Sequence, residues 1–297
     1  MHRDGSGSPR LLVTGASGVL GWTLCRQAAA RWQTFGTVLR NPVEPPGVQV
    51  HRIDLTRRRE VVGLFRSIRP DAVIHAAALS SPDYCQQHPT ESEAANVAAS
   101  TYVAAMCAEF SIPCVFTSSD LVFDGEHALY DEESAAEPVS IYGEHKLRAE
   151  EEMRARYPSI TVCRLPLMFG EGSPAAHGYF RRALQSMKQG AEVRLFTDEM
   201  RTPVSTATAA EGLMMALRSA QGETLHLGGG GKRQQVGVGT AHRRSLLLRQ
   251  RPSGPLPAGR RILAGAAAAG RIAGQYQGQG NRVSPADHSR ADVSSAG

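Results

Sequence analysis

A glycine-rich turn between a short apolar strand and a helix is the feature of this sequence that most constrains its fold. The stretch TGASGVLG spaces three glycines three residues apart, directly after the apolar run RLLVTG at residues 10–15. Such glycines allow a tight bend and a close approach of the backbone to a diphosphate, which then lies at a helix N-terminus. A purely structural turn is the alternative. The dinucleotide-binding residues predicted here are Gly15, Ser17, Gly18, Val19, Leu20 and Gly21.

Apolar strands alternate with amphipathic helices through the following 150 residues. Strands without strict apolar and polar alternation, separated by helices, are typical of a parallel sheet covered on both faces. The expected fold class is therefore α/β, a doubly wound parallel sheet of the NAD(P)-binding Rossmann type. The expected strands are 10–15, 34–40, 48–55, 71–78, 112–119 and 159–166, and the expected helices are 19–32, 57–68, 91–110 and one that contains Tyr142.

Composition indicates a globular chain without a membrane segment. Of the 297 residues 41% are apolar, enough for a sizeable core, yet no apolar run approaches the length of about 18 residues that spans a bilayer. The opening MHRDGSGSPR lacks the apolar region of a signal peptide. We therefore expect a cytoplasmic protein with no membrane partner. The five cysteines have no CxxC spacing and the histidines no ligand-like spacing, so no metal site is predicted.

The net charge of +5 divides unevenly along the chain. Residues 232–297 hold 11 basic and 2 acidic side chains, whereas residues 1–231 hold 22 basic and 26 acidic ones. The acidic body shows no basic stripe that could follow a phosphate backbone. Nucleic acid is therefore not an expected partner.

One Tyr-x-x-x-Lys pair stands in the segment SIYGEHKLRAEE at residues 140–151, in a chain with only three lysines. Reduction of a ketone needs a hydride donor and an acid that protonates the developing alkoxide. A tyrosine, with an ordinary pKa of about 10, serves better when a nearby cation favours its phenolate form. Lys146 lies one helical turn from Tyr142 and can supply that charge. An exposed Tyr–Lys pair on a helix surface is the alternative.

Five motifs occur in an order that resembles the extended short-chain dehydrogenases/reductases. They are TGASGVLG, DLT (54–56), HAAA (75–78), TSSDLVFDG (117–125) and YGEHK (142–146), and the resemblance covers about residues 10–228. Within that superfamily, the Ser-Ser-Asp segment and DEMRTPVSTATAAEGL (198–213) look most like the dTDP-4-dehydrorhamnose reductase family and its relative, the regulatory β subunit of methionine adenosyltransferase.

The resemblance implies a catalytic group of four residues. Tyr142 would donate the proton, Lys146 would support it and bind the cofactor ribose, and Ser119 would orient the substrate carbonyl. Asp120 would help to position the substrate or the proton relay. Ser and Asp also favour ordinary turns, which is the alternative for Ser119 and Asp120. Leu121 stands where a dehydratase of this superfamily would have Glu, so dehydration is disfavoured.

The cofactor is expected to be NADP(H), with NAD(H) as the alternative. Rossmann proteins that use NAD carry an acid at the end of the second strand, whereas this chain has Arg40, a basic residue suited to a 2′-phosphate. His75 is interpreted as a core histidine. The remaining cofactor-binding residues implied by the resemblance are Asp54, Leu55, Ala76, Ala77, Ala78, Asn96, Ser118 and Leu165, with Tyr142 and Lys146 contributing from the catalytic group.

A sugar nucleotide is the expected substrate. The resemblance places its contacts at Ser80 and Arg201, because a guanidinium can grip a diphosphate with two hydrogen bonds. A capping or surface role is the alternative for Arg201. A homodimer is an expectation at the level of the family only.

Three parts are expected along the chain. Residues 9–164, with a returning segment at about 201–227, would form the Rossmann domain, and residues 165–200 would belong to a small C-terminal substrate lobe. Residues 228–297 are rich in Gly, Ala, Arg and Gln and lack periodicity, so we interpret them as a disordered basic tail or an out-of-frame translation. The substrate lobe would then be incomplete.

The resulting hypothesis is an NADP(H)-dependent reductase of a 4-keto sugar nucleotide. A non-catalytic NADP-binding regulatory subunit and a sugar-nucleotide epimerase remain as alternatives, because both share these motifs.

Overall fold

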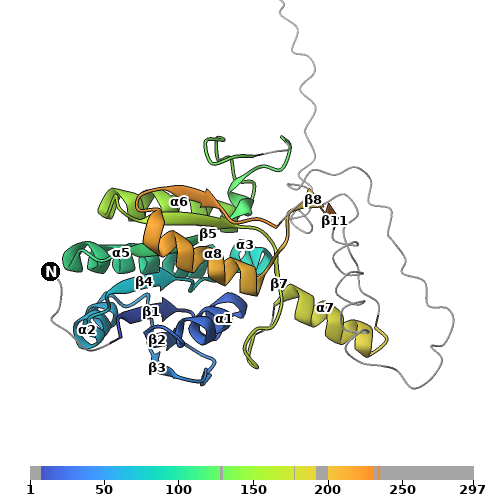
Figure 1. The fold of residues 1–297 in the computed structure, drawn as a ribbon. Helices are drawn as coiled ribbons and strands as arrows, with labels where there is room; N and C mark the ends of the chain where they lie inside the picture. The colour runs from blue at the N-terminus through green and yellow to red at the C-terminus, as the bar shows by residue number, and fades with distance from the viewer. Residues whose placement is uncertain (1–7, 128–129, 177, 192–199, 230–232, 235–297) are drawn as a thin grey trace, which may run out of the picture.

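A seven-stranded parallel sheet forms the centre of the computed structural model, which describes residues 8–127, 130–176, 178–191, 200–229 and 233–234 (Figure 1). Its strand order is β10-β6-β5-β4-β1-β2-β3, and each neighbouring pair is parallel. The expected doubly wound fold is confirmed. The strands are β1 (Arg10–Thr14), β2 (Gln33–Val38), β3 (Val48–Arg52), β4 (Ala72–His75), β5 (Cys114–Ser119), β6 (Thr161–Leu165) and β10 (Thr224–His226).

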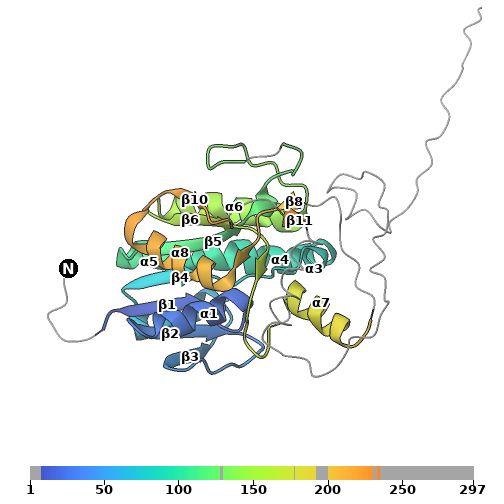
Figure 2. The same cartoon turned by 45° about the vertical axis from the view of Figure 1, so that its right-hand side comes forward.

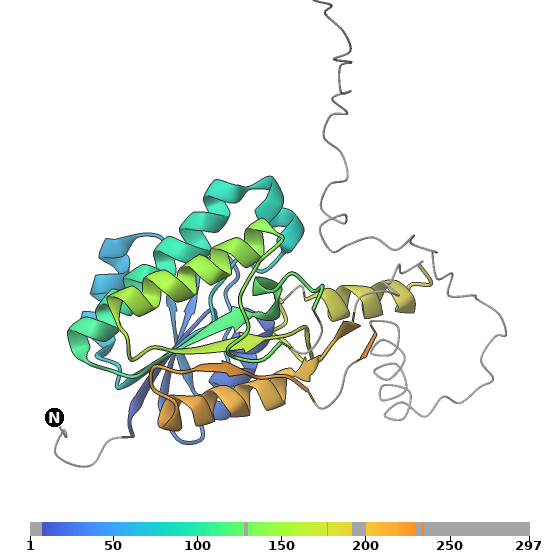
Figure 3. The same cartoon turned by 90° about the horizontal axis from the view of Figure 1, so that it is seen from above.

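Helices cover both faces of the sheet. The helices α1 (Val19–Ala28) and α8 (Thr206–Ser219) pack on one face, and α2 (Arg58–Ile68), α5 (Ala99–Phe110) and α6 (Ile141–Arg156) pack on the other (Figure 3). Successive residues of β1 therefore enter two different apolar clusters, Leu11 and Val13 on the α1 side and Leu12 on the α5 side. This two-sided burial explains why the strands read as continuous apolar runs.

Smaller elements lie beyond the carboxyl ends of the strands. The strand β7 (Met168–Phe169) pairs with β9 (Val204–Ser205), and β8 (Met200–Arg201) pairs antiparallel with β11 (Arg233–Gln234). Together with α7 (Tyr179–Lys188), the pair β8 and β11 flanks the end of the sheet where α3 (Pro82–Gln87) also lies (Figure 2). Of the expected tail from residue 228, the structure describes only residues 228–229 and 233–234; the rest lies outside the described residues.

The helices differ from expectation at several points, and the one expected over 19–32 ends at Ala28. The helix expected over 91–110 begins at Pro89 and is divided into α4 (Pro89–Glu93), a π-helical segment η1 (Ala94–Ala98) and α5. The helix α3 was not predicted, although its start carries two helix signals, because Ser81 caps the Tyr84 N–H and Pro82 follows it. No helix within the described ranges is long and apolar enough to cross a bilayer.

Candidate active site

A cavity of about 2610 Å³ lies at the carboxyl ends of the central strands. It spans the point where the strand order reverses, with β1 between β2 and β4, which is where ligands bind in open α/β sheets. Pockets for drug-sized ligands measure roughly 300–1,000 Å³. The cavity therefore has room for a dinucleotide and a second ligand together.

All but one of the predicted site residues line this cavity. The exception is Asn96. The lining set comprises Gly15, Ser17, Gly18, Val19, Leu20, Gly21, Arg40, Asp54, Leu55, Ala76, Ala77, Ala78, Ser80, Ser118, Ser119, Asp120, Tyr142, Lys146, Leu165 and Arg201.

The glycine turn has a shape that only glycine permits at two positions. Gly15 has a φ of +75°, and a Cβ there would lie 2.8 Å from Ala77 Cα. A Cβ on Gly21 would collide with the carbonyl oxygen of Gly15. Among the described residues, no side chain caps α1, and its first turn holds no acid. The N–H groups at this helix start are thus suited to an anion.

His75 supports the loop after β4 from inside the core, as expected. It is fully buried, with Nδ1 2.7 Å from Thr14 Oγ1 and Nε2 3.0 Å from Ser100 Oγ. Ser100 donates its hydroxyl proton to a helix carbonyl, so His75 Nε2 carries hydrogen and Nδ1 accepts from Thr14. Burial lowers the pKa of His75 to about 3, which keeps the ring neutral. Thr14 Oγ1 in turn accepts the N–H groups of residues 76 and 77.

Asn96, the one predicted site residue outside the cavity lining, lies behind the cavity wall. Its side chain is buried in the π-helical segment and does not line the cavity. Oδ1 accepts the Leu79 N–H at 2.9 Å, while Nδ2 donates to the Leu79 carbonyl at 3.1 Å and to Ser92 Oγ at 3.2 Å. Asn96 therefore holds the loop that forms a cavity wall, and no contact with a cofactor follows from its position. A π-helical segment next to such a wall is a common feature of functional sites.

Ser119 and Tyr142 face the same part of the cavity from different elements. Ser119 is the last residue of β5. Tyr142 is the second residue of α6, whose N-terminus is capped by Ser140 Oγ on the Gly143 N–H at 3.1 Å. Burial raises the pKa of Tyr142 above its ordinary value, although a hydrogen bond with the Ser119 side chain opposes this. The phenol is thus a protonated donor at neutral pH.

Lys146 points toward the strand backbone. Its Nζ donates to the Thr117 carbonyl at 2.6 Å and lies 4.1 Å from the centre of the Phe116 ring. The side chain is 2% exposed, and burial lowers its pKa to about 7 although Glu150 acts in the opposite direction. The Lys146 amine is therefore only partly charged at neutral pH.

Arg201 binds a carboxylate within the cavity. Its Nε and Nη2 donate to the two oxygens of Asp120 at 2.8 and 2.6 Å. The Arg201 side chain is 14% exposed, so the surface role considered from sequence is wrong. Burial raises the pKa of Asp120, against the influence of Arg201.

The sequence analysis did not predict two of the residues that line the cavity, Arg164 and His226. Within the described ranges, Ser118 Oγ, Arg164 Nη1 and His226 Nε2 are buried without a hydrogen-bond partner, and all three residues line the cavity. Arg164 pairs in register with Ser118 on one side and His226 on the other, so they lie side by side on β5, β6 and β10. The sequence signal that could have revealed Arg164 is an arginine inside the otherwise apolar strand TVCRL. Its partner Glu150, at 2.8 Å, neutralises its charge.

Among the described residues no group of three His, Cys, Asp or Glu side chains could hold a metal ion. The chemistry of the cavity wall is instead that of hydroxyl, phenol and amine groups around a glycine turn.

A family model described as "RmlD substrate binding domain" matches residues 9–257. The match begins just before β1 and extends into the segment that the sequence marks as a basic tail.

Two curated proteins illustrate the similarity. The probable low-salt glycan biosynthesis reductase Agl14 of Haloferax volcanii is 31% identical over 220 residues, which cover 72% of this chain and 73% of that protein. The methionine adenosyltransferase 2 subunit beta of Mus musculus is 32% identical over 165 residues, which cover 55% of this chain and 48% of that protein. The aligned part thus spans only about half the length of the mouse subunit.

Solved structures share the fold. A hypothetical dTDP-4-dehydrorhamnose reductase of Sulfolobus tokodaii is 25% identical, with a TM-score of 0.70 over 80% of this chain and 82% of that one. The dTDP-4-dehydrorhamnose reductase of Bacillus anthracis, solved in complex with NADP, is 19% identical, with a TM-score of 0.70 over 82% of both chains.

Proposed function

This chain belongs to the RmlD substrate binding domain family, a family of extended short-chain dehydrogenases/reductases, and from that membership we propose that it is an NADP(H)-dependent reductase of a 4-keto sugar nucleotide. The observation that carries the proposal is the placement of Ser119, Tyr142 and Lys146 in one cavity with the glycine turn at Gly15.

The cavity residues suit ketone reduction. A dihydronicotinamide held by the glycine turn would supply the hydride that the carbonyl carbon accepts. The carbonyl oxygen then takes the Tyr142 phenol proton, which gives a hydroxyl group, while the Ser119 hydroxyl orients that oxygen. Protonated Lys146 stabilises the phenolate that remains on Tyr142 until solvent replaces the proton.

The chain's own residues fit a dinucleotide. The start of α1 has no side-chain cap or first-turn acid among the described residues, and Gly15 and Gly21 carry no side chain where the backbone packs closely. Arg40 lines the adjoining wall and supports the choice of NADP(H), because it replaces the acid that would accept ribose hydroxyls.

A sugar nucleotide suits the other end of the cavity. Ser118, Arg164 and His226 line this end of the cavity and give it a polar wall, which suits a hydroxyl-rich ligand. Because Glu150 neutralises the charge of Arg164, these three side chains favour neutral sugar oxygens over a phosphate. Ser80 and Arg201 remain the proposed contacts for the rest of the substrate.

A non-catalytic regulatory subunit is the second candidate. It is favoured by the 32% identity over 165 residues to the methionine adenosyltransferase 2 subunit beta of Mus musculus. An epimerase would use the same motifs, and the stereochemistry of the product would identify one.

Turnover of a 4-keto sugar nucleotide tests the proposal. The purified chain should oxidise NADPH when such a ketone is added, and Tyr142→Phe should lower the rate by about 10²- to 10⁴-fold while leaving the affinity for NADPH within a few fold. Tyr102→Phe is the matched control, because Tyr102 packs in the apolar cluster on the α5 face and does not line the cavity. Tight NADPH binding without turnover by the unmodified chain would instead favour the regulatory subunit.

A further inference from the structure

Arg40 is engaged by an acidic side chain from another element that lines the cavity. Arg40 follows β2, and its Nη2 donates to Glu91 Oε1 of α4 at 2.8 Å. Both residues line the cavity. The acid that the end of β2 lacks is therefore supplied by a helix 51 residues further along the chain.

A tyrosine from α3 holds that acid in place. The Tyr84 hydroxyl donates to the other carboxylate oxygen, Glu91 Oε2, at 2.7 Å. Hydrogen bonds from Tyr84 and Arg40 keep the pKa of Glu91 below its ordinary value, so the carboxylate is ionised at neutral pH. Both of its oxygens thus have a donor, and the ion pair with Arg40 is the more solvated contact, with side chains 69% and 39% exposed.

We propose that Glu91 restrains Arg40 and thereby limits the preference of this site for a 2′-phosphorylated dinucleotide. This inference rests on the proposed role of Arg40 in cofactor binding. A 2′-phosphate that approaches Arg40 must draw the guanidinium from Glu91 and meets the repulsion of that carboxylate. A dinucleotide with a free 2′-hydroxyl carries no such charge, so Glu91 opposes only the phosphorylated form.

The expected size of the effect follows from the exposure of the pair. Exposed ion pairs contribute little and are screened by salt, so removal of the Glu91 charge should tighten NADPH binding by about two- to fivefold at low ionic strength. NADH binding should stay within about twofold, because no phosphate competes for Arg40.

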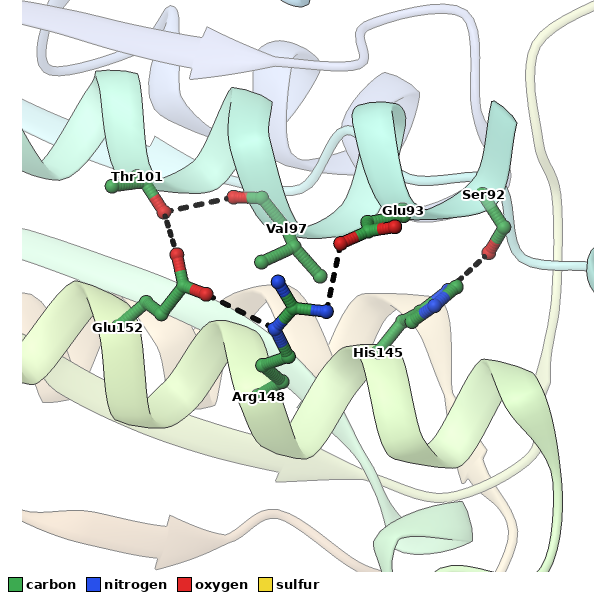
Figure 4. A network of polar contacts seen from close by, with 7 residues as sticks. All are labelled: Ser92, Glu93, Val97, Thr101, His145, Arg148 and Glu152. Atoms are coloured by element: carbon green, nitrogen blue, oxygen red, sulfur yellow. Dashed lines mark hydrogen bonds and ion pairs between the residues drawn. The ribbon is translucent and has the colours of Figure 1, made fainter. Parts of the chain in front are cut away.

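A charge-neutral variant of the same shape tests the proposal. Fluorescence titrations with NADPH and NADH would compare the full chain with Glu91→Gln and with Glu93→Gln. Glu93 lies on the same helix, but it pairs with Arg148 of α6 at 2.7 Å, beside the Ser92–His145 contact (Figure 4). We expect Glu91→Gln alone to raise the NADPH preference. An unchanged ratio of the two affinities in Glu91→Gln would overturn the restraint.

The double variant shows whether the effect passes through Arg40. In an Arg40→Gln background, Glu91→Gln should no longer alter the ratio; an equal gain in that background would overturn the proposal. Two other results would contradict the cofactor-binding role of Arg40 or the reductase proposal itself. If Arg40→Gln leaves NADPH binding unchanged, Arg40 does not recognise the 2′-phosphate, and if neither dinucleotide binds the unmodified chain, the proposed reductase is wrong.

Discussion

Asp120 and Arg201, which are 81 residues apart in the chain, form a two-pronged ion pair inside the cavity. The carboxylate follows the end of β5, and the guanidinium belongs to β8 beyond the sheet. The pair therefore links the end of the central strand β5 to the small strand β8.

Removal of one partner of this pair should cost stability. Arg201→Ala leaves the partly buried Asp120 carboxylate without its cation, so we expect a loss of about 1–3 kcal/mol in the free energy of unfolding and a Tm lower by several degrees. Urea denaturation provides the measurement. The double variant with Asp120→Ala should recover part of the loss, since no charge is then left unpaired. A double variant as unstable as the sum of its single changes would contradict this coupling.

Replacement of glycine by alanine should have opposite effects on stability at two helix positions, Gly63 in α2 and Gly21 in α1. Gly→Ala within a helix normally adds about 0.5–1 kcal/mol of stability. Gly63→Ala in α2 should show this gain, because a Cβ there meets nothing within 4 Å. Gly21→Ala in α1 should instead destabilise the fold by about 1–3 kcal/mol and weaken dinucleotide binding, because its Cβ collides with the Gly15 carbonyl. Thermal denaturation and cofactor titration of both variants would check this, and equal behaviour would refute it.

Lys146 predicts a pH dependence of stability. Its pKa falls from 10.5 to about 7 on burial, so the unfolded chain holds more protons than the folded one between these values. The cost of charging Lys146 is fully present below about pH 7 and declines as pH rises toward 10.5. Lys146→Met should therefore gain stability relative to the unmodified protein near neutral pH, and the gain should shrink toward pH 10. Lys146→Arg, which keeps the charge, should show no such gain; a pH-independent difference for the Met variant would contradict the buried amine.

Much of the fold could be predicted because its signals are local. The apolar run RLLVTG and the glycines after it lie within about a dozen residues, and they correctly predicted β1, the turn and the start of α1. The π-helical segment around Asn96 was not predicted, because its irregularity depends on packing against neighbours. Asn96 itself binds Leu79, a residue 17 positions earlier, and only the folded loop brings the two together.

Electrostatic partners were the least predictable part of the site. Arg201 and Arg40 were both expected to meet phosphate groups, but in the structure each binds an acid of the chain, Asp120 and Glu91. Arg164 and His226 were missed because a strand sequence does not reveal which of its polar atoms end without a partner.

The sequence by itself determined the order of strands and helices, the glycine turn and the Tyr142–Lys146 spacing, since these depend on backbone conformation and hydrophobic periodicity over short distances. Tertiary structure alone decided which charges meet and how far each is removed from water. Lys146 illustrates this division: its place one turn after Tyr142 is local, whereas its lowered pKa arises from burial among β5 and α6. Contacts between residues far apart in the chain depend on how the elements pack, and desolvation depends on the whole of that packing.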